Sequence, residues 1–316
     1  MPRVDRSTIW PYDAAGEPRE FYYSRYGHPT GAEAEARLGL LEGGQALLFA
    51  SGMAAETATV LAFARPGTTI ALAEGAYFGT SVLFGSLEAW GLRFVEYDQT
   101  QAPPSDADIV WVESPANPLL TVPDWEALGA HDGLVVCDST VATPVYLRAL
   151  DKGADVVIHS ATKFITGSHN ALCGATIVRD PERFEELKRV RTLTGSVCSP
   201  HSAASVTTGL DSLSRRMRRI TATSTEIARR LDAHPAVEVV RYPGYSGLIS
   251  FDVADPRSVE TATKVIANAT SLGGVNSTME SRHRWEGDRL PEGLLRLSIG
   301  LEDVEQLWGD LAQALP

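Results

Sequence analysis

The sequence has few cysteines and little positive charge. Its 316 residues include three cysteines, Cys137, Cys173 and Cys198, with no CxxC spacing. An odd number of cysteines without paired spacing excludes a disulfide framework and is typical of a reducing compartment. Lysine and arginine total 28 against 40 acidic residues, which gives a formal net charge of −12. Because a nucleic-acid binder needs a basic face for phosphates, we expect no nucleic-acid partner.

Long apolar runs and metal-binding patterns are also missing. No stretch reaches the ~18 apolar residues of a membrane-spanning helix, so we expect no contact with a membrane. Residues 1–6 lead into polar sequence without the apolar region of a secretory signal, so we expect a cytoplasmic protein. The seven histidines form neither HxxxH nor HExxH, and we therefore predict no metal site.

The composition is that of a folded protein in which lysine is rare. Apolar residues make up 44% of the chain and charged residues 22%, which excludes a disordered chain. Only four of the 28 basic residues are lysines, so a lysine that performs chemistry is easier to identify. The densest basic cluster, Arg215, Arg216, Arg218 and Arg219, lies on a predicted helix, and we interpret it as a solvated face.

Strand-like and helix-like segments alternate through the first half of the chain. We predict strands at 69–73, 93–97, 109–113, 134–138 and 155–159, with helices at 52–64, 78–90 and 125–130. This alternation is typical of a buried parallel sheet with helical crossovers. Right-handed crossovers place the carboxyl ends of the strands along one edge, where ligands bind in such sheets.

The pattern changes after about residue 174. We predict a strand at 175–178, a long helix at 202–231, strands at 237–242 and 247–253, a helix near 258–269 and a strand at 294–299. This order indicates a smaller α+β domain that begins near residue 223 and is joined to the first domain by the long helix.

A possible phosphate site lies at the start of the helix predicted at 52–64. Ser51 can cap that helix, and Gly52 allows a ligand to approach the backbone closely. The free amides and positive dipole end of a helix N-terminus suit a phosphate. The same pattern also occurs in ordinary capped helices.

Two further residues follow neighbouring predicted strands. Asp138 ends an apolar strand, where it either caps the next loop or binds a protonated ring nitrogen. Lys163 follows the next strand in an apolar segment, where desolvation would lower its pKa and favour a Schiff base. A lysine that reaches from a strand end to solvent is the alternative. A phosphate site, a carboxylate and a lysine at one edge are together what pyridoxal 5′-phosphate (PLP) requires.

Several ordered motifs resemble one enzyme family. They are YYSRYGHPT at 22–30, ESPANP at 113–118, DVVIHSATKFITG at 155–167 and LRLSIGLE at 295–302. On these motifs the chain resembles the Cys/Met-metabolism PLP-dependent enzymes, which include cystathionine γ-lyase and cystathionine γ-synthase. The resemblance implies PLP fold type I, an aspartate aminotransferase-like α/β large domain with a mostly parallel sheet and a smaller α+β C-terminal domain. It divides the chain into a shortened N-terminal arm (1–22), a PLP-binding domain (23–222) and a C-terminal domain (223–316).

The resemblance also assigns roles to single residues. Lys163 would bind PLP covalently and move protons, Asp138 would bind the pyridine nitrogen, and Tyr77 would stack on the ring and act as an acid or base. The remaining cofactor residues, mostly around the phosphate, would be Gly52, Met53, Thr140, Ser160 and Thr162. Tyr23 and Arg25 would reach the phosphate of a neighbouring subunit, which implies a homodimer with shared sites and a homotetramer built from it.

The substrate implied by the resemblance is a small amino acid. Asn117, Ser271 and Arg296 would hold its carboxylate, because the arginine fork pairs with both carboxylate oxygens. Gly79 stands where methionine γ-lyases carry a cysteine, which argues mildly against that activity. We therefore expect γ-elimination on cystathionine-like substrates, with γ-replacement by a synthase as the alternative. A nucleotide-binding module is disfavoured, because neither GxGxxG nor GxxxxGK[ST] follows a strand.

Overall fold

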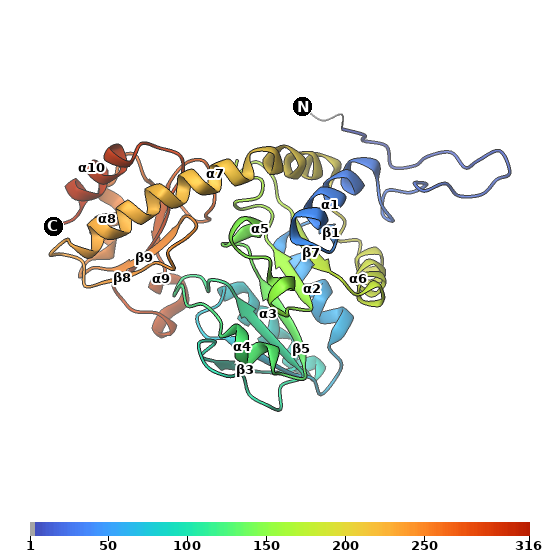
Figure 1. Cartoon of the computed structure of the whole chain (residues 1–316), viewed down its shortest axis with the longest axis horizontal. Coiled ribbons are helices and arrows are strands. Elements are labelled where there is room, and N and C mark those ends of the chain that lie inside the picture. Colours follow the sequence, from blue (N-terminus) through green and yellow to red (C-terminus); the bar gives the residue numbers. More distant parts are fainter. Residues whose placement is uncertain (1–3) are drawn as a thin grey trace.

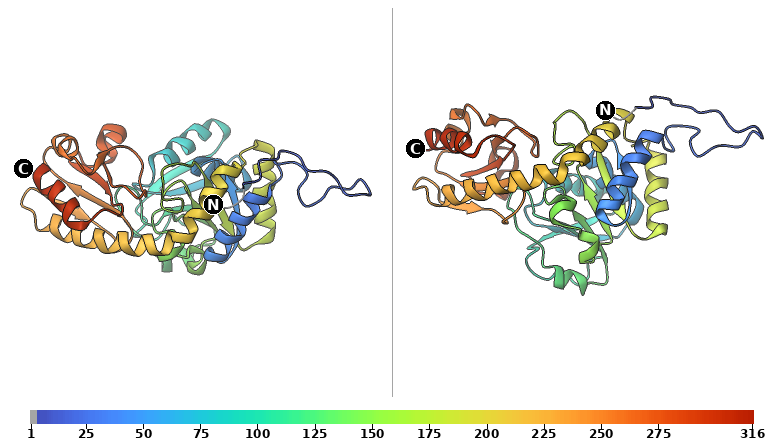
Figure 2. Two further views of the ribbon diagram at one scale, coloured as in Figure 1. Left: turned by 90° about the horizontal axis from the view of Figure 1, so that it is seen from above. Right: turned by 45° about the horizontal axis from the view of Figure 1, so that its top comes forward.

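The chain builds two sheets that are connected by one long helix. The computed structural model describes residues 4–316. Helix α7 (Pro200–Asp232) runs from the larger sheet to the smaller one (Figure 1). The segment before α1 (Pro29–Glu42) projects from the body at the end opposite the C-terminus in both views of Figure 2. In the part of the chain that the structure describes, no helix is both long enough and apolar enough to cross a membrane.

The larger sheet has seven strands in the order β1-β7-β6-β5-β4-β2-β3. Strands β2 to β6 are mutually parallel, and β7 is antiparallel to both of its neighbours, β6 and β1. The mostly parallel sheet predicted from the sequence is therefore confirmed. The strand bounds are β1 Gln45–Phe49, β2 Thr69–Ala73, β3 Arg93–Tyr97, β4 Ile109–Glu113, β5 Leu134–Asp138, β6 Val156–His159 and β7 Gly174–Val178.

Helices cover both faces of this sheet. Along β5, Val135 and Cys137 belong to an apolar cluster shared with α1 and α7, whereas Val136 belongs to one shared with α2 and α3. This burial on both faces explains why the strands read as continuous apolar runs. The helices are α2 Gly52–Phe63, α3 Phe78–Leu87, α4 Trp125–Gly129, α5 Thr143–Tyr146 and α6 Pro181–Thr194, with 3₁₀ turns η1 Glu88–Trp90 and η2 Ala149–Lys152.

The smaller sheet has five strands in the order β10-β11-β12-β9-β8. Its strands are β8 Val239–Arg241, β9 Leu248–Asp252, β10 Ala267–Asn268, β11 Thr278–Ser281 and β12 Leu294–Ser298. The accompanying helices are α8 Pro256–Ala262, α9 His283–Glu286 and α10 Val304–Ala314, with the 3₁₀ turn η3 Gly287–Arg289.

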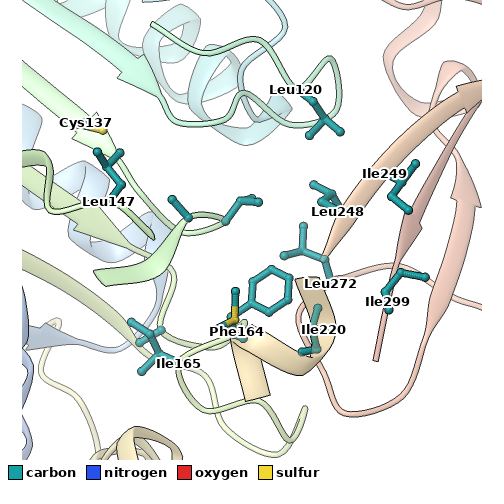
Figure 3. Close-up of a cluster of buried hydrophobic side chains, with 14 of the residues drawn as sticks. Leu120, Cys137, Leu147, Phe164, Ile165, Ile220, Leu248, Ile249, Leu272 and Ile299 are labelled. Atoms are coloured by element: carbon teal, nitrogen blue, oxygen red, sulfur yellow. The ribbon is translucent and has the colours of Figure 1, made fainter. Parts of the chain in front are cut away.

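One apolar cluster continues from the larger sheet into the smaller one. Figure 3 shows Phe164 and Ile220 beside Leu248 of β9 and Leu272, all of them buried. The predicted domain boundary between residues 222 and 223 falls inside α7, so this helix contributes to both parts. The boundary itself stays a prediction.

The helix predicted near 258–269 is wrong beyond residue 262. Helix α8 ends at Ala262, and the next backbone amides turn toward α10. The amides of Lys264, Val265 and Ile266 each donate to the Asp310 carboxylate at 2.8 Å. A buried carboxylate that accepts three amide hydrogen bonds competes successfully with continuation of the helix.

The interpretation of the arginine cluster on α7 is wrong for one of its members. Arg216 is buried, whereas the other three arginines are exposed. Its Nη1 donates to Phe164 O (2.8 Å) and its Nη2 to Ile165 O and Gly209 O (both 3.0 Å). Arg216 therefore fixes the backbone directly after Lys163 onto α7.

Candidate active site

Most of the predicted site residues of one subunit line one cavity of about 380 Å³. Its walls follow directly on β1, β2, β4, β5 and β6, all of which end at the same edge of the larger sheet. The opposite wall comes from the smaller sheet. The predicted residues in the lining are Gly52, Met53, Tyr77, Asn117, Asp138, Thr140, Ser160, Thr162, Lys163, Ser271 and Arg296.

Lys163 lies in the turn after β6 and points into this cavity. Its Nζ donates to Ser271 Oγ at 3.1 Å. Burial, with a contribution from the positive charge of Arg296, lowers the pKa of Lys163 to about 8. A substantial fraction of the amine is therefore neutral at mildly alkaline pH. A neutral amine is the form that attacks an aldehyde carbon.

Asp138 is the last residue of β5 and is buried. Its Oδ1 accepts from the Thr140 amide at 2.7 Å, and the Thr140 hydroxyl accepts from the Ser160 amide at 2.7 Å. Burial raises the pKa of Asp138, although its hydrogen bonds to Thr140 oppose the shift. Among residues 4–316, no arginine, lysine or histidine forms an ion pair with Asp138. A protonated ring nitrogen would supply the missing positive charge.

The start of α2 offers backbone donors at the same cavity. Ser51 Oγ caps the helix by accepting from the Ala54 amide at 3.1 Å. The first helical amides, Gly52 and Met53, have no acceptor within the helix. A Cβ on Gly52 would lie 3.0 Å from Ser160 Cβ, so the absence of a side chain keeps this corner open. These donors suit a phosphate group.

The two hydroxyl groups predicted near the phosphate have different surroundings. Thr162 Oγ1 is bound to the backbone of Cys173, donating to its carbonyl at 3.2 Å and accepting from its amide at 3.0 Å. Ser160 Oγ forms no hydrogen bond within the described chain and faces the cavity. Direct phosphate contact by either hydroxyl stays a prediction, and Ser160 has the freer one.

Arg296 on β12 lies at the other end of the cavity. Its Nη1 donates to Asn117 Oδ1 (3.1 Å), and its Nη2 donates to Ser271 O (3.1 Å) and Glu280 Oε1 (2.9 Å). Burial, followed by the charge of Arg282, lowers the pKa of Arg296 to about 10, so it is still positive at neutral pH. Ser271 has a φ of 87°, a left-handed conformation that is rare for residues other than glycine and costs energy.

Tyr77 precedes α3 and is partly exposed at the cavity. Its backbone amide donates to Glu113 Oε2 at 2.8 Å, and the same oxygen accepts from the Asn117 amide at 3.2 Å. Burial, followed by the negative charge of Glu56, raises the pKa of Tyr77. The phenol therefore holds its proton at neutral pH and is a potential donor.

Three ionisable residues of the cavity were not predicted from the sequence. They are Glu56, Glu113 and Arg282. Glu56 Oε2 accepts from Thr80 Oγ1 at 2.8 Å, and burial together with the nearby Asp138 raises the pKa of Glu56 to about 8. Its spacing of four residues from Gly52 places both on one helix face, a signal that could have identified it.

Tyr23 and Arg25 lie outside the cavity, in the segment before α1. Arg25 Nη1 donates to Thr192 O at 3.1 Å, and its guanidinium lies 5.3 Å from the centre of the Tyr23 ring. Their predicted contact is with the phosphate of a second subunit, and that contact stays a prediction.

The residues present fit PLP. Asp138 is a buried carboxylate without an ion-pair partner among residues 4–316, Lys163 is an amine with a lowered pKa, and the free amides of Gly52 and Met53 suit a phosphate. The same cavity extends to Arg296, where an amino-acid carboxylate would bind. Within the described chain, no group of three or more histidine, cysteine or acidic residues could hold a metal ion.

Comparisons with known proteins give one consistent match. Residues 2–316 match the family model described as Cys/Met metabolism PLP-dependent enzyme. A putative cystathionine gamma-lyase of Streptomyces coelicolor is 34% identical, over 95% of this chain and 85% of the relative. A cystathionine gamma-synthase of Mycobacterium leprae is 34% identical, over 98% and 90%. The solved structure of apo CalE6, a methionine gamma lyase from Micromonospora echinospora, has a TM-score of 0.94 at 35% identity, over 100% of this chain and 93% of that one.

Proposed function

Because the chain belongs to the family of Cys/Met metabolism PLP-dependent enzymes, we propose that it eliminates a γ-sulfur substituent from an amino acid, as a cystathionine γ-lyase does. One observation carries the proposal: Lys163, Asp138 and Arg296 line one cavity of a size suited to a cofactor and a small amino acid. On cystathionine, elimination followed by hydrolysis yields cysteine, a 2-oxo acid and ammonia.

The residues of the cavity divide the work between binding and proton transfer. PLP, when bound, supplies an electron sink for negative charge at the substrate Cα. Arg296 and Asn117 hold the α-carboxylate and thereby orient the Cα–H bond toward Lys163. Lys163 Nζ takes that proton as a neutral amine, the form favoured above its lowered pKa of about 8, and would hand it to the bound cofactor. Expelling a γ-sulfur also requires the electron pair of a Cβ–H bond, so we assign the removal of a second proton, from Cβ, to the same amine.

The leaving γ-sulfur needs a proton donor. Tyr77 lines the cavity and, because burial raises its pKa, carries its phenolic proton at neutral pH. We assign the protonation of the departing thiolate to Tyr77 Oη. Glu113 positions this residue, since its carboxylate binds the backbone amides of both Tyr77 and Asn117.

A γ-replacement reaction is the second candidate. A relative named cystathionine gamma-synthase is as similar to the chain as the one named putative cystathionine gamma-lyase. A synthase adds a thiol to the four-carbon unit that remains after the γ-substituent has left, whereas a lyase releases that unit. The residues assigned above would therefore serve either reaction.

A product assay separates the two reactions. The purified holoenzyme is incubated either with cystathionine alone or with an O-acylhomoserine and cysteine, and 2-oxo acid, ammonia and cystathionine are measured. We expect 2-oxo acid and ammonia from cystathionine in the first mixture. Net formation of cystathionine in the second, without release of ammonia from the first, would overturn the lyase assignment.

The proposal includes an assembly and a location. Exposed aromatic residues, Tyr12, Tyr23 and Tyr26, lie on the segment before α1 that projects from the body (Figure 1). We propose that this segment packs on a second copy to form a homodimer with shared sites, that two dimers form a homotetramer, and that the enzyme acts in the cytoplasm.

A further inference from the structure

Arg282 is a second arginine in the substrate end of the cavity. It follows β11 directly, is buried with 7% exposure, and lines the cavity. Its Nε and Nη2 donate to Glu286 Oε1 at 3.0 and 2.7 Å, and its Nη1 donates to Glu280 Oε1 at 2.5 Å. Burying a guanidinium in a ligand cavity has a large desolvation cost, so its position requires an explanation.

Arg282 and Arg296 are held by the same carboxylate oxygen. Glu280 Oε1 accepts from Nη1 of Arg282 and from Nη2 of Arg296, which places the two guanidinium groups side by side. Both positive charges act on the cavity, because each contributes to lowering the pKa of Lys163. The substrate end thus has two cationic forks, whereas the α-carboxylate of an amino acid occupies one.

Donors of Arg282 are left over for a ligand. A guanidinium has five N–H groups, and the hydrogen bonds to Glu280 and Glu286 use three of those of Arg282. Within residues 4–316, one N–H on each terminal nitrogen has no acceptor. A carboxylate is the group that matches two such donors.

We propose that Arg282 binds a second carboxylate at the far end of the γ-substituent, so that the enzyme prefers substrates with an acidic substituent over those with a neutral one. This inference takes the type of reaction from the proposed function, and what it adds concerns only how the substrate binds. It predicts that cystathionine and O-succinylhomoserine are better substrates than methionine and O-acetylhomoserine.

A purely structural role for Arg282 makes a different prediction. The segment that carries Arg282 also contains Arg289, whose Nη1 donates to Ser81 Oγ of α3 (2.6 Å) and whose Nη2 donates to Glu96 Oε1 of β3 (2.5 Å). If Arg282 only neutralised Glu280 and Glu286 and held this segment in place, its loss would weaken the binding of acidic and neutral ligands equally. The ratio between acidic and neutral ligands therefore distinguishes the two roles.

Binding is measured first with two amino acids that lack a leaving group. L-2-aminoadipate carries a distal carboxylate, and L-norleucine is a neutral analogue with a chain of similar length. Their Kd values are obtained from the absorbance change of the bound cofactor in the holoenzyme, which requires no γ-elimination. The wild-type protein should bind 2-aminoadipate more tightly, and equal affinities would overturn the proposal.

The variants are Arg282→Gln and, as a charge-preserving replacement, Arg282→Lys. We expect Arg282→Gln to raise the Kd of 2-aminoadipate by about 10- to 100-fold and that of norleucine by less than about threefold. Arg282→Lys should fall between wild type and Arg282→Gln. An equal loss for both ligands, or no loss, would leave Arg282 a structural residue; if Arg282→Gln does not fold, the wild-type preference and Arg282→Lys decide.

Arg219→Gln is the control for the loss of one positive charge. Arg219 is exposed on α7, donates to Leu301 O at 3.0 Å and is not part of the cavity lining. Its replacement should leave the preference between the two ligands unchanged. If kcat/KM shows no γ-elimination while 2-aminoadipate is still preferred, the proposed function fails and the role of Arg282 stands.

Discussion

Lys163 shows how the surroundings of one residue prepare it for chemistry. It has the chemistry of an ordinary lysine, but burial and the charge of Arg296 lower its pKa to about 8. A lowered pKa means that the amine becomes neutral as the pH rises through about 8, well below the usual range for lysine. The lowered pKa should therefore affect the reaction of Lys163 with PLP, which takes place before any substrate is added.

The rate of covalent PLP uptake should therefore rise with pH. Cofactor-free protein mixed with PLP at pH values between about 6 and 9 should show a half-maximal rate near pH 8, because only the neutral amine attacks the aldehyde. Stopped-flow absorbance with borohydride trapping measures the rate. The ε-amine of a free lysine derivative, with its ordinary pKa, is the control, and the same pH dependence in both would contradict the effect of burial.

Single site residues could be predicted where a strand pattern surrounds them. Asp138 and Lys163 stand at the ends of strands that are buried on both faces, so an acid and an amine there are conspicuous in the sequence. Glu56 and Arg282 were not predicted, because a glutamate inside a helix and an arginine after a strand are common on protein surfaces. Their burial results from packing between distant segments.

At the scale of elements, the turn that carries Lys163 depends on α7. Replacing Arg216 with methionine removes the donors to Phe164 O, Ile165 O and Gly209 O, which stay buried. We expect a loss of about 2–4 kcal/mol in the free energy of unfolding, together with weaker PLP retention. Thermal unfolding and cofactor absorbance after dialysis measure the two effects.

Arg218→Met is the matched control for that prediction. Arg218 lies on the exposed side of the same helix and binds Ser214 Oγ at 2.7 Å. Its replacement should change the free energy of unfolding by less than about 0.5 kcal/mol. Similar effects of the two variants would show that the contacts of Arg216 do not support the turn.

Elements were predicted well where a local apolar or alternating pattern determines them. The strands predicted at 69–73, 93–97, 109–113 and 134–138 coincide with β2, β3, β4 and β5, and three of the four are almost fully buried. The helix expected near 258–269 failed because Asp310, more than forty residues away, binds the amides that would have continued it. Contacts at that distance leave no local signal in the sequence.

At the scale of the whole molecule, the expected architecture is confirmed. A mostly parallel seven-stranded sheet with a smaller mixed α/β part, together with solved structures of the family at TM-scores above 0.9, agrees with PLP fold type I. The motifs made this prediction possible, because they fix the order of the cofactor-binding segments along the chain. The proposed sharing of sites between subunits predicts a result for mixtures of variants.

Shared sites should allow two inactive variants to restore activity together. Lys163→Ala removes the lysine of a subunit's own site, and Arg25→Met removes the group proposed to reach the neighbouring site. In a hybrid dimer one of the two sites keeps both residues. After dissociation and random reassociation we expect about a quarter of the wild-type activity in the mixture.

Each variant alone provides the control for this mixing experiment. Lys163→Ala should retain its fold, measured by circular dichroism, and lose turnover by on the order of 10³-fold or more. Activity in the mixture that stays at the sum of the separate variants would contradict a site built from two subunits.

The unbroken course of α7 has a mechanical consequence. At ~1.5 Å per residue its 33 residues form a rod of ~50 Å, with the Lys163 turn fastened near its middle and the smaller sheet resting on its far half. A helix of this length resists stretching, so the two walls of the cavity, one from each sheet, cannot move apart along it. A change in the distance between Lys163 and Arg296 would therefore require rotation of the smaller sheet relative to α7, against the apolar cluster that joins the two parts.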